Sequence, residues 1–362
     1  MADAAATDLV RRIRKQAEAC AELGSPFYAA LLERLADDVA AGGPAAVVLA
    51  GHESDPTDSV LSLRLLGAVH RLVLERRAPL LATSYPSVGG TGDAAAAWPA
   101  LRDVLVEHVD ELRLSLQRAP QTNEVGRAAV LAGGLAHIGA WRAAPVRLVE
   151  IGASGGLNLR VDGFRVEAGD GTGVGPPDSP LVLRDAWSGR LPPTDDVPEV
   201  VARLGCDPHP VDPTTTEGRL VLTSYVWPDQ STRLERLRAA FQVAQRAPAE
   251  VVQEGAETFV RRLELVPGTT TVVWHSVMWQ YLTDEGRATV DEALDQLGAR
   301  ADGSTGLARL SLEPGRRAPE RDVEFLVRLR TWPATAAGTD TEDRLGHVLA
   351  GASPHGPPVV WD

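Results

Sequence analysis

Residues 146–159 read VRLVEIGASGGLNL, an apolar strand-like run that ends in Glu150 and leads into a glycine-rich turn. The turn covers residues 152–156, and a helix is expected to begin at residues 157–159. A strand, a glycine turn and a helix in this order let the backbone approach a ligand closely and direct amide N–H groups at it. Nowhere else does the sequence hold several residue types needed for one kind of chemistry at fixed spacing.

The composition is that of a globular protein with a sizeable core. The chain has 362 residues, of which 44% are hydrophobic and 23% charged, and this length predicts roughly two domains. The net charge of -13 argues against an extended nucleic-acid interface, which needs a basic face. Lys15 is the only lysine, so a Walker-type phosphate loop, which requires a Gly-Lys pair, is excluded.

Cysteine usage and hydropathy point to a reducing compartment. Cys20 and Cys206 provide neither a disulfide framework nor a zinc-type CxxC pattern. Residues 1–20 lack the apolar segment of a signal peptide, and no run approaches the ~20 apolar residues of a membrane span. We therefore expect the protein to be cytoplasmic and to bind neither membrane nor nucleic acid. Its expected partner is a small-molecule substrate. The oligomeric state does not follow from the sequence.

Two domains are expected. Apolar residues recur at helical spacing through residues 1–140, which predicts an all-helical N-terminal domain. In residues 141–362 strands alternate with helices, which predicts a Rossmann-like α/β domain with a mostly parallel sheet. From Leu307 onward, predicted strands follow one another with short turns between them, so an antiparallel C-terminal hairpin is expected at the sheet edge. Residues 168–180 are rich in glycine and proline and are expected to form a loop. Strands are predicted at 146–151, 163–166, 181–183, 220–225, 270–275, 307–312, 323–330 and 359–361, and helices at 230–245, 247–263 and 284–297.

The glycine turn favours S-adenosylmethionine (SAM) over NAD. In the dinucleotide fingerprint GxGxxG, Ser154 would replace the second glycine and Leu157 the third. The pattern acidic-x-Gly-x-Gly-x-Gly of SAM-binding proteins accepts a small residue such as serine in place of the middle glycine. Acidic side chains near such turns bind ribose hydroxyls or a ligand ammonium group. The residues expected to hold SAM are Glu150, Gly152, Ser154, Gly156 and Asn158.

The same five turn residues also spell Gly-x-Ser-x-Gly, the nucleophile elbow of α/β hydrolases. In this alternative Ser154 is the nucleophile, and a later Asp with His347 or His355 completes a triad. The hydrolase fold needs several strands before its elbow, whereas the residues ahead of this turn have a helical pattern. A third alternative is a non-catalytic protein on a degenerate methyltransferase scaffold, in which the turn binds no ligand.

Other candidate site residues lie near the ends of predicted elements. His275 ends a strand, where a general base or a hydrogen-bonded core histidine is expected. Asp229 is either a second catalytic group or a helix cap. Glu124 and Arg127 are spaced for a surface ion pair or for lining the cleft. The complete set of candidate substrate-binding residues is Asn123, Glu124, Arg127, Trp227 and Trp279.

A metal site is not expected. Cys206, Asp207, His209 and Asp212 lie close together in the sequence, but they mix soft with hard donors. Their segment is rich in proline and has no second ligand cluster to complete a coordination sphere.

The sequence also resembles a known family over essentially its whole length. The segments that carry the resemblance are TNEVGR (122–127), VEIGASGGLNL (149–159), GCDPHPVDPTTTEGRL (205–220), SYVWPDQ (224–230), VVWHSVMWQYL (272–282), LEP (312–314) and HGPPVVW (355–361). They are similar to an uncharacterised bacterial domain-of-unknown-function family. The resemblance implies a class I SAM-dependent methyltransferase-like fold, with SAM as cofactor and a small-molecule acceptor. It also implies an acid that binds ribose after the second strand, which would be Glu167 or Asp170.

Overall fold

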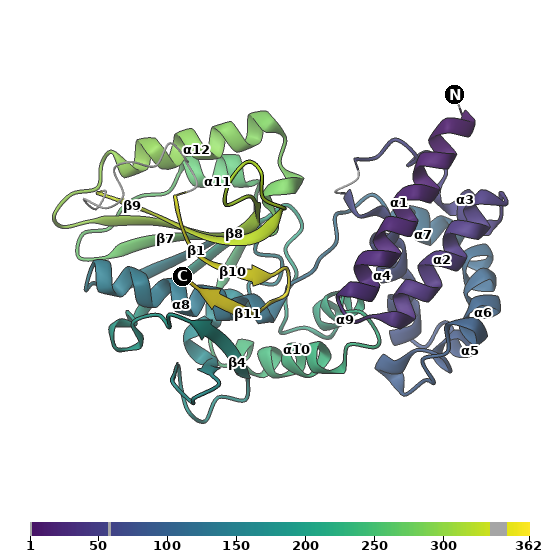
Figure 1. The fold of residues 1–362 in the computed structure, drawn as a ribbon, viewed down its shortest axis with the longest axis horizontal. Coiled ribbons are helices and arrows are strands. Elements are labelled where there is room, and N and C mark those ends of the chain that lie inside the picture. The colour runs from purple at the N-terminus through teal and green to yellow at the C-terminus, as the bar shows by residue number, and fades with distance from the viewer. Residues whose placement is uncertain (1, 57–58, 334–345) are drawn as a thin grey trace. The chain divides into compact units, whose positions relative to one another are not determined.

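The computed structural model of the chain describes residues 2–56, 59–333 and 346–362. The chain divides into two compact units (Figure 1). The first consists of Met1–Thr122 and Thr215–Glu235, and the second of Asn123–Thr214 and Arg236–Asp362. We call the first the helical unit and the second the sheet unit. The division differs from the boundary expected near residue 140, because residues 123–140 belong to the sheet unit.

Helices make up the described part of the helical unit. They are α1 (Ala2–Glu22), α2 (Pro26–Ala40), α3 (Pro44–Leu49), α4 (Leu61–Leu74), α5 (Pro79–Ala82), the 3-10 helix η2 (Pro86–Val88), α6 (Ala94–Glu107), α7 (Val109–Ser115) and α9 (Thr216–Ser224). The strand predicted at 220–225 is wrong, because these residues extend a helix. Thr215 caps that helix by accepting a hydrogen bond from Gly218 N at 3.0 Å. A short apolar run does not by itself distinguish a strand from a buried helix turn.

The sheet unit is built on one 11-stranded sheet with the order β3-β2-β4-β11-β10-β9-β8-β7-β1-β5-β6. The strands are β1 (Val146–Ile151), β2 (Arg165–Ala168), β3 (Gly173–Val174), β4 (Val182–Gly189), β5 (Val200–Asp207), β6 (Glu250–Gln253), β7 (Thr270–Ser276), β8 (Gly306–Gly315), β9 (Glu324–Trp332), β10 (His347–Ser353) and β11 (Gly356–Trp361). The helices are η3 (Val125–Arg127), α8 (Ala128–Trp141), η4 (Asn158–Gly163), η5 (Thr194–Asp196), α11 (Ala256–Arg261), η6 (Trp279–Tyr281) and α12 (Asp284–Gly298), and α10 (Ser231–Ala244) spans the division between the units.

Five neighbouring strands of this sheet, β6-β5-β1-β7-β8, are parallel. After β1 the chain builds β5 and β6 on one side of β1, and it then returns to build β7 and β8 on the other side. The strand order therefore reverses at β1. In open α/β sheets, ligands bind outside the carboxyl ends of the strands at such a reversal.

Helices cover both faces of the parallel strands (Figure 1). On one face, Val149 and Val273 pack with apolar residues of α11 and α12 in a single buried cluster. On the other face α8 approaches so closely that a Cβ at Gly134 would lie 2.3 Å from the Leu310 side chain. Glycine at this position lets the helix backbone rest on the strand.

Several predicted elements differ from the observed ones. β5 and β10 were not predicted, and the helix expected at 247–263 is instead β6 followed by α11. The antiparallel strands after β8 are confirmed, but they do not form the sheet edge, because β11 pairs in parallel with β4. The expected loop at 168–180 contains the short strand β3.

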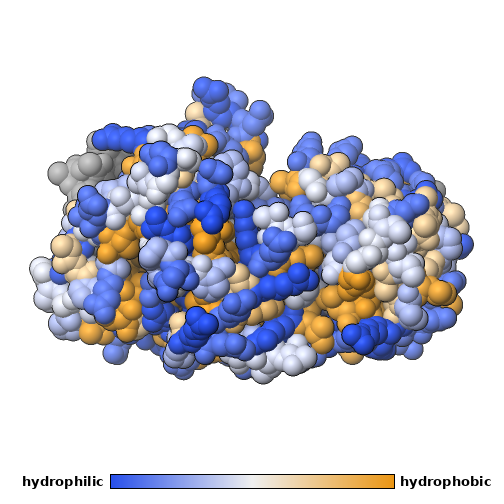
Figure 2. Space-filling view, turned by 90° about the horizontal axis from the view of Figure 1, so that it is seen from below, coloured by the Kyte–Doolittle hydropathy of each residue, from blue (hydrophilic) through white to orange (hydrophobic). Residues whose placement is uncertain are grey.

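No helix in the described ranges has both the length and the apolar character that a membrane crossing requires. On the face drawn in Figure 2, hydrophobic residues lie in small groups among hydrophilic ones.

Candidate functional site

The glycine turn leaves the carboxyl end of β1 in a left-handed backbone conformation. Gly152, Ser154 and Gly156 have φ angles of 69°, 52° and 60°. Such angles suit glycine and are costly for serine. A Cβ at Gly152 would lie 2.9 Å from the Met278 Cβ, and one at Gly156 would lie 2.7 Å from Val251. Side chains of the protein therefore pack directly against the glycines.

Most of the turn's amide groups are hydrogen-bonded within the protein. Ala153 N donates to Cys206 O at 3.0 Å, and Ser154 N donates to Asp207 Oδ2 at 2.9 Å. Leu157 N donates to Asn123 Oδ1 at 2.9 Å. The following element is the short 3-10 helix η4, not an α-helix. The expectation of a helix N-terminus that directs free N–H groups at a ligand is therefore wrong for these amides.

Glu150 lies at the reversal of the strand order and is 3% exposed. Its register partner on β7 is Trp274, so the two side chains share one face of the sheet. Burial raises the pKa of Glu150 to about 8, although the Asn158 amide and the guanidinium groups of Arg127 and Arg160 act in the opposite direction. Among the residues that the structure describes, Glu150 Oε2 has no hydrogen-bond partner, which leaves a buried acceptor at this point.

The predicted residues at 123–127 do meet the glycine turn. Besides the bond from Leu157 to Asn123, Asn158 Nδ2 donates to Glu124 O at 3.3 Å. Glu124 caps η3 by accepting from Gly126 N at 3.0 Å, and it is buried. Arg127 Nη1 donates to Ser276 O at 3.0 Å, which connects this segment to the end of β7. The structure therefore brings three of the predicted substrate-binding residues beside the predicted cofactor-binding ones.

Asp207, which the sequence suggested only as one of four weak metal-ligand candidates, also lies at the glycine turn. It ends β5, the strand that pairs with β1, and its side chain is buried. The expected ribose acids lie elsewhere: Glu167 is in β2, near the far edge of the sheet, and bonds to Arg165, and Asp170 accepts from Thr172 N in a turn. The signal in the sequence was an acid that follows the Gly-Cys pair of 205–206 and precedes Pro208.

His275 is fully buried, and both of its ring nitrogens are engaged. Arg309 Nε, which can only donate, bonds to His275 Nε2 at 3.0 Å. His275 Nδ1 therefore carries the proton and donates to Glu313 Oε1 at 2.8 Å. Burial lowers the pKa of His275, which keeps the ring neutral. The geometry favours the core-histidine alternative; a role as general base stays a prediction. Glu313 and Arg309 were not predicted.

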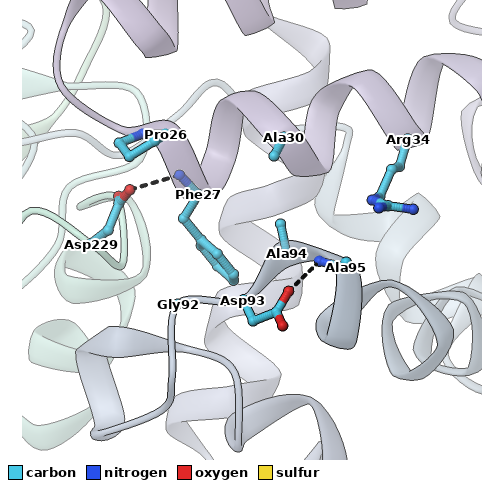
Figure 3. Close-up of a pocket in the computed structure, with 9 residues that line it drawn as sticks. All are labelled: Pro26, Phe27, Ala30, Arg34, Gly92, Asp93, Ala94, Ala95 and Asp229. Atoms are coloured by element: carbon cyan, nitrogen blue, oxygen red, sulfur yellow. Dashed lines mark hydrogen bonds between the residues drawn. The ribbon is translucent and has the colours of Figure 1, made fainter.

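The predicted residues Asp229 and Trp227 belong to the helical unit. Asp229 Oδ1 accepts from Ser25 Oγ at 2.6 Å and Oδ2 accepts from Phe27 N at 2.9 Å, so its carboxylate caps α2. Trp227 packs in the apolar core of this unit. A cavity of about 490 Å³ lies beside this cap. Figure 3 shows residues that line it, among them Asp229 and Arg34.

Trp279, the fifth predicted substrate-binding residue, lies in the sheet unit beside His275. Its ring stacks on the His275 ring with centroids 4.9 Å apart, and the Arg309 guanidinium lies 4.4 Å from the Trp279 ring. Trp279 therefore packs with the buried residues of β7 and β8.

Across the described ranges, no group of three or more His, Cys, Asp and Glu side chains is placed to hold a metal ion.

No curated protein matches the chain. A family profile matches residues 10–361, nearly the whole sequence. The chain therefore belongs to the bacterial family described as "uncharacterized protein conserved in bacteria (DUF2332)".

Proposed function

We propose that the sheet unit is a Rossmann-like, SAM-dependent methyltransferase domain that acts on a small molecule. The observation that carries the proposal is the position of Glu150. Its buried carboxylate, with an unpartnered oxygen, lies at the carboxyl end of the strand where the order of parallel strands reverses. That is the place where open α/β sheets bind nucleotides, and the Gly-x-Ser-x-Gly turn begins two residues after Glu150.

The residues present fit such a cofactor. A buried acceptor such as Glu150 Oε2 gains a partner when a ligand ammonium group donates to it. The Asp207 carboxylate already accepts two backbone N–H groups, and a carboxylate has about four lone-pair sites, so it can also accept ribose hydroxyls. Bound SAM supplies an electrophilic methyl group.

The protein's own contribution to the reaction is then mainly alignment. Asn123, Glu124 and Arg127 connect the glycine turn to the end of β7 and hold the two at a fixed separation. Positioning two reactants can lower a barrier by about 7–11 kcal/mol. The three residues therefore stand where an acceptor molecule would be oriented.

Isothermal titration with SAM and with its demethylated product tests the proposal. We expect both ligands to bind, and Glu150→Gln to weaken binding of both by about tenfold, because a ligand ammonium group stabilises the ionised form of Glu150 and glutamine cannot ionise. Glu167→Gln, which alters an ion pair in β2, is the matched control and should bind normally. If neither ligand binds at millimolar concentration, the domain is not a SAM enzyme, and the non-catalytic scaffold becomes the better description.

A second candidate, serine hydrolysis by Ser154, has one observation in its favour. Ser154 is a non-glycine residue with positive φ at the centre of Gly-x-Ser-x-Gly. Its side chain is buried, however, and a 3-10 helix follows in place of the α-helix of the hydrolase elbow. A fluorophosphonate probe decides between them: labelling of the wild type that Ser154→Ala abolishes would support the hydrolase, and an unlabelled wild type would exclude it.

A further inference from the structure

The loop between β7 and α12 places one side chain on the glycine turn. Met278 is the residue that a Cβ at Gly152 would meet, at 2.9 Å from its Cβ, 3.1 Å from its Cγ and 3.4 Å from its Cε. The whole length of the methionine side chain therefore lies along the Cα of Gly152. A ligand that approached the backbone of the turn here would have to occupy the same space.

Hydrogen bonds hold Met278 in this place. Glu313 Oε1 accepts from Met278 N at 3.2 Å and from Trp279 N at 3.4 Å. Val277 N donates to Leu312 O at 2.9 Å, and Val277 has a φ of 51°, a strained value for a β-branched residue. The loop is therefore fastened to β8 immediately before and immediately after the methionine.

The residue that follows makes the loop more rigid. Trp279 stacks on the buried His275 ring and also receives the Arg309 guanidinium, so it cannot shift without disturbing both. The Met278 side chain has no such restraint. It is partly buried, packs against the edge of the apolar cluster that contains Ile151 and Cys206, and has three rotatable side-chain bonds.

We propose that Met278 is a cover over Gly152: its Cβ stays in place on the loop, and the adenosine part of SAM reaches the turn only when the side chain beyond Cβ rotates away. The inference rests on the proposed function for the identity of the ligand, but the cover itself is a property of the protein alone. Because a hydrogen-bonded loop carries this long, unbranched side chain, Met278 is the residue that sets how tightly the turn binds its ligand. Binding then includes the free energy of opening.

Cys206 reports on the cover without any ligand. Its thiol accepts a hydrogen bond from the Gly152 backbone, and burial raises its pKa to about 12. Cys20, in the core of the helical unit, also has its thiol pKa raised to about 12 by burial, so it is an internal control for general unfolding. The rate of iodoacetamide alkylation is measured separately at each cysteine by peptide mass spectrometry.

We expect Met278→Ala to raise the alkylation rate of Cys206 about tenfold, because local opening governs access to a buried group, and to leave Cys20 unchanged. Leu282→Ala is the matched control, since Leu282 packs on the same cluster from the same loop without covering Gly152. It should leave both rates near the wild-type values. Equal Cys206 rates in Met278→Ala and the wild type would overturn the cover.

Titration with SAM completes the test. If the open state is populated about one part in ten, removing the cover tightens the apparent affinity about tenfold. If the wild type binds SAM as tightly as Met278→Ala or more tightly, the proposal that Met278 is a cover is overturned, and the proposed function stays intact. Faster alkylation of Cys206 in Met278→Ala, with no SAM binding by any variant, supports the cover and overturns the proposed function.

Discussion

The Asp207 carboxylate is bonded to the glycine turn: Oδ2 accepts the backbone N–H of Ser154 at 2.9 Å. Its other oxygen, Oδ1, accepts from His209 N at 2.8 Å. One side chain at the end of β5 therefore fixes both the turn after β1 and the chain that leaves β5. The positive φ of Ser154 is held in place by this bond.

Asp207→Asn should lower the free energy of unfolding by about 1–3 kcal/mol, because the amide retains one acceptor oxygen and presents N–H groups to the second backbone donor. Urea denaturation followed by circular dichroism measures the change. Asp178→Asn, at an exposed position, is the control and should unfold like the wild type. An Asp207→Asn variant as stable as the wild type would show that the bond to Ser154 adds nothing.

The raised pKa of Glu150 predicts a dependence of stability on pH. Its carboxyl ionises near pH 4.5 in the unfolded chain and at about pH 8 in the folded protein. Between these values the folded state binds more protons, so the stability that Glu150 contributes is complete below pH 4.5 and is lost as pH rises through 8.

Glu150→Gln removes this titration and keeps the shape of the side chain. From about pH 5 to pH 9 the wild type should lose at least about 1 kcal/mol more unfolding free energy than the variant. Urea denaturation at each pH provides the comparison, with Glu167→Gln as the control. Parallel pH profiles for wild type and Glu150→Gln would mean that Glu150 is already ionised when folded.

Glu313 is expected to be critical for stability, since its buried carboxylate serves His275 and the loop at once. Glu313→Ala should cost about 3–5 kcal/mol, the range found when one partner of a buried polar pair is removed. The control is Glu324→Ala, whose pairing with Arg317 is half-exposed and should contribute less than about 1 kcal/mol. Similar losses for the two variants would contradict the structural role of Glu313.

Asp229 can be tested as a helix cap. Asp229→Ala should destabilise the start of α2 by about 1–2 kcal/mol, a typical value for loss of a cap. Hydrogen exchange measured by mass spectrometry should then become faster at the backbone amides of residues 27–30, which follow Pro26. Asp93, which caps α6 through Ala95 N and Ala96 N, is the matched control: Asp93→Ala should affect residues 95–98 instead. Unchanged exchange at residues 27–30 combined with lost methyl transfer would favour the catalytic prediction for Asp229.

The central strands were predictable because their composition is unambiguous. β1 is apolar apart from Arg147 and Glu150, β7 is rich in β-branched residues, and each is buried over nearly its whole length, so composition and burial agree. β5 was missed because it contains Gly205, which weakens a strand pattern, and because several of its positions are only half-buried. Because β5 was not predicted, nothing in the sequence placed Asp207 beside β1, and Glu167 and Asp170 were the acids expected to bind ribose.

The candidate site was predictable only in part, for a similar reason. Glu150 and the glycine turn are contiguous in sequence, and so are Asn123 and Glu124, so local spacing identified them. The partners of His275 come from β8, and nothing in the sequence near His275 predicts that Glu313 and Arg309 occupy its two nitrogens. Asp229 was grouped with His275 because both follow apolar runs, whereas the run before Asp229 is helix α9.

The position of β11 has a consequence for how the sheet is assembled. β11 lies between β10 and β4, and thereby joins the group β3-β2-β4 to the rest of the sheet. β4 is synthesised long before its partner, so during translation the edge of residues 182–189 stays unpaired until residues 356–361 emerge. Pairings between such distant segments form slowly, and exposed strand edges invite association with other chains. Chaperone dependence in the nascent chain would thus originate at β4, far from the glycine turn.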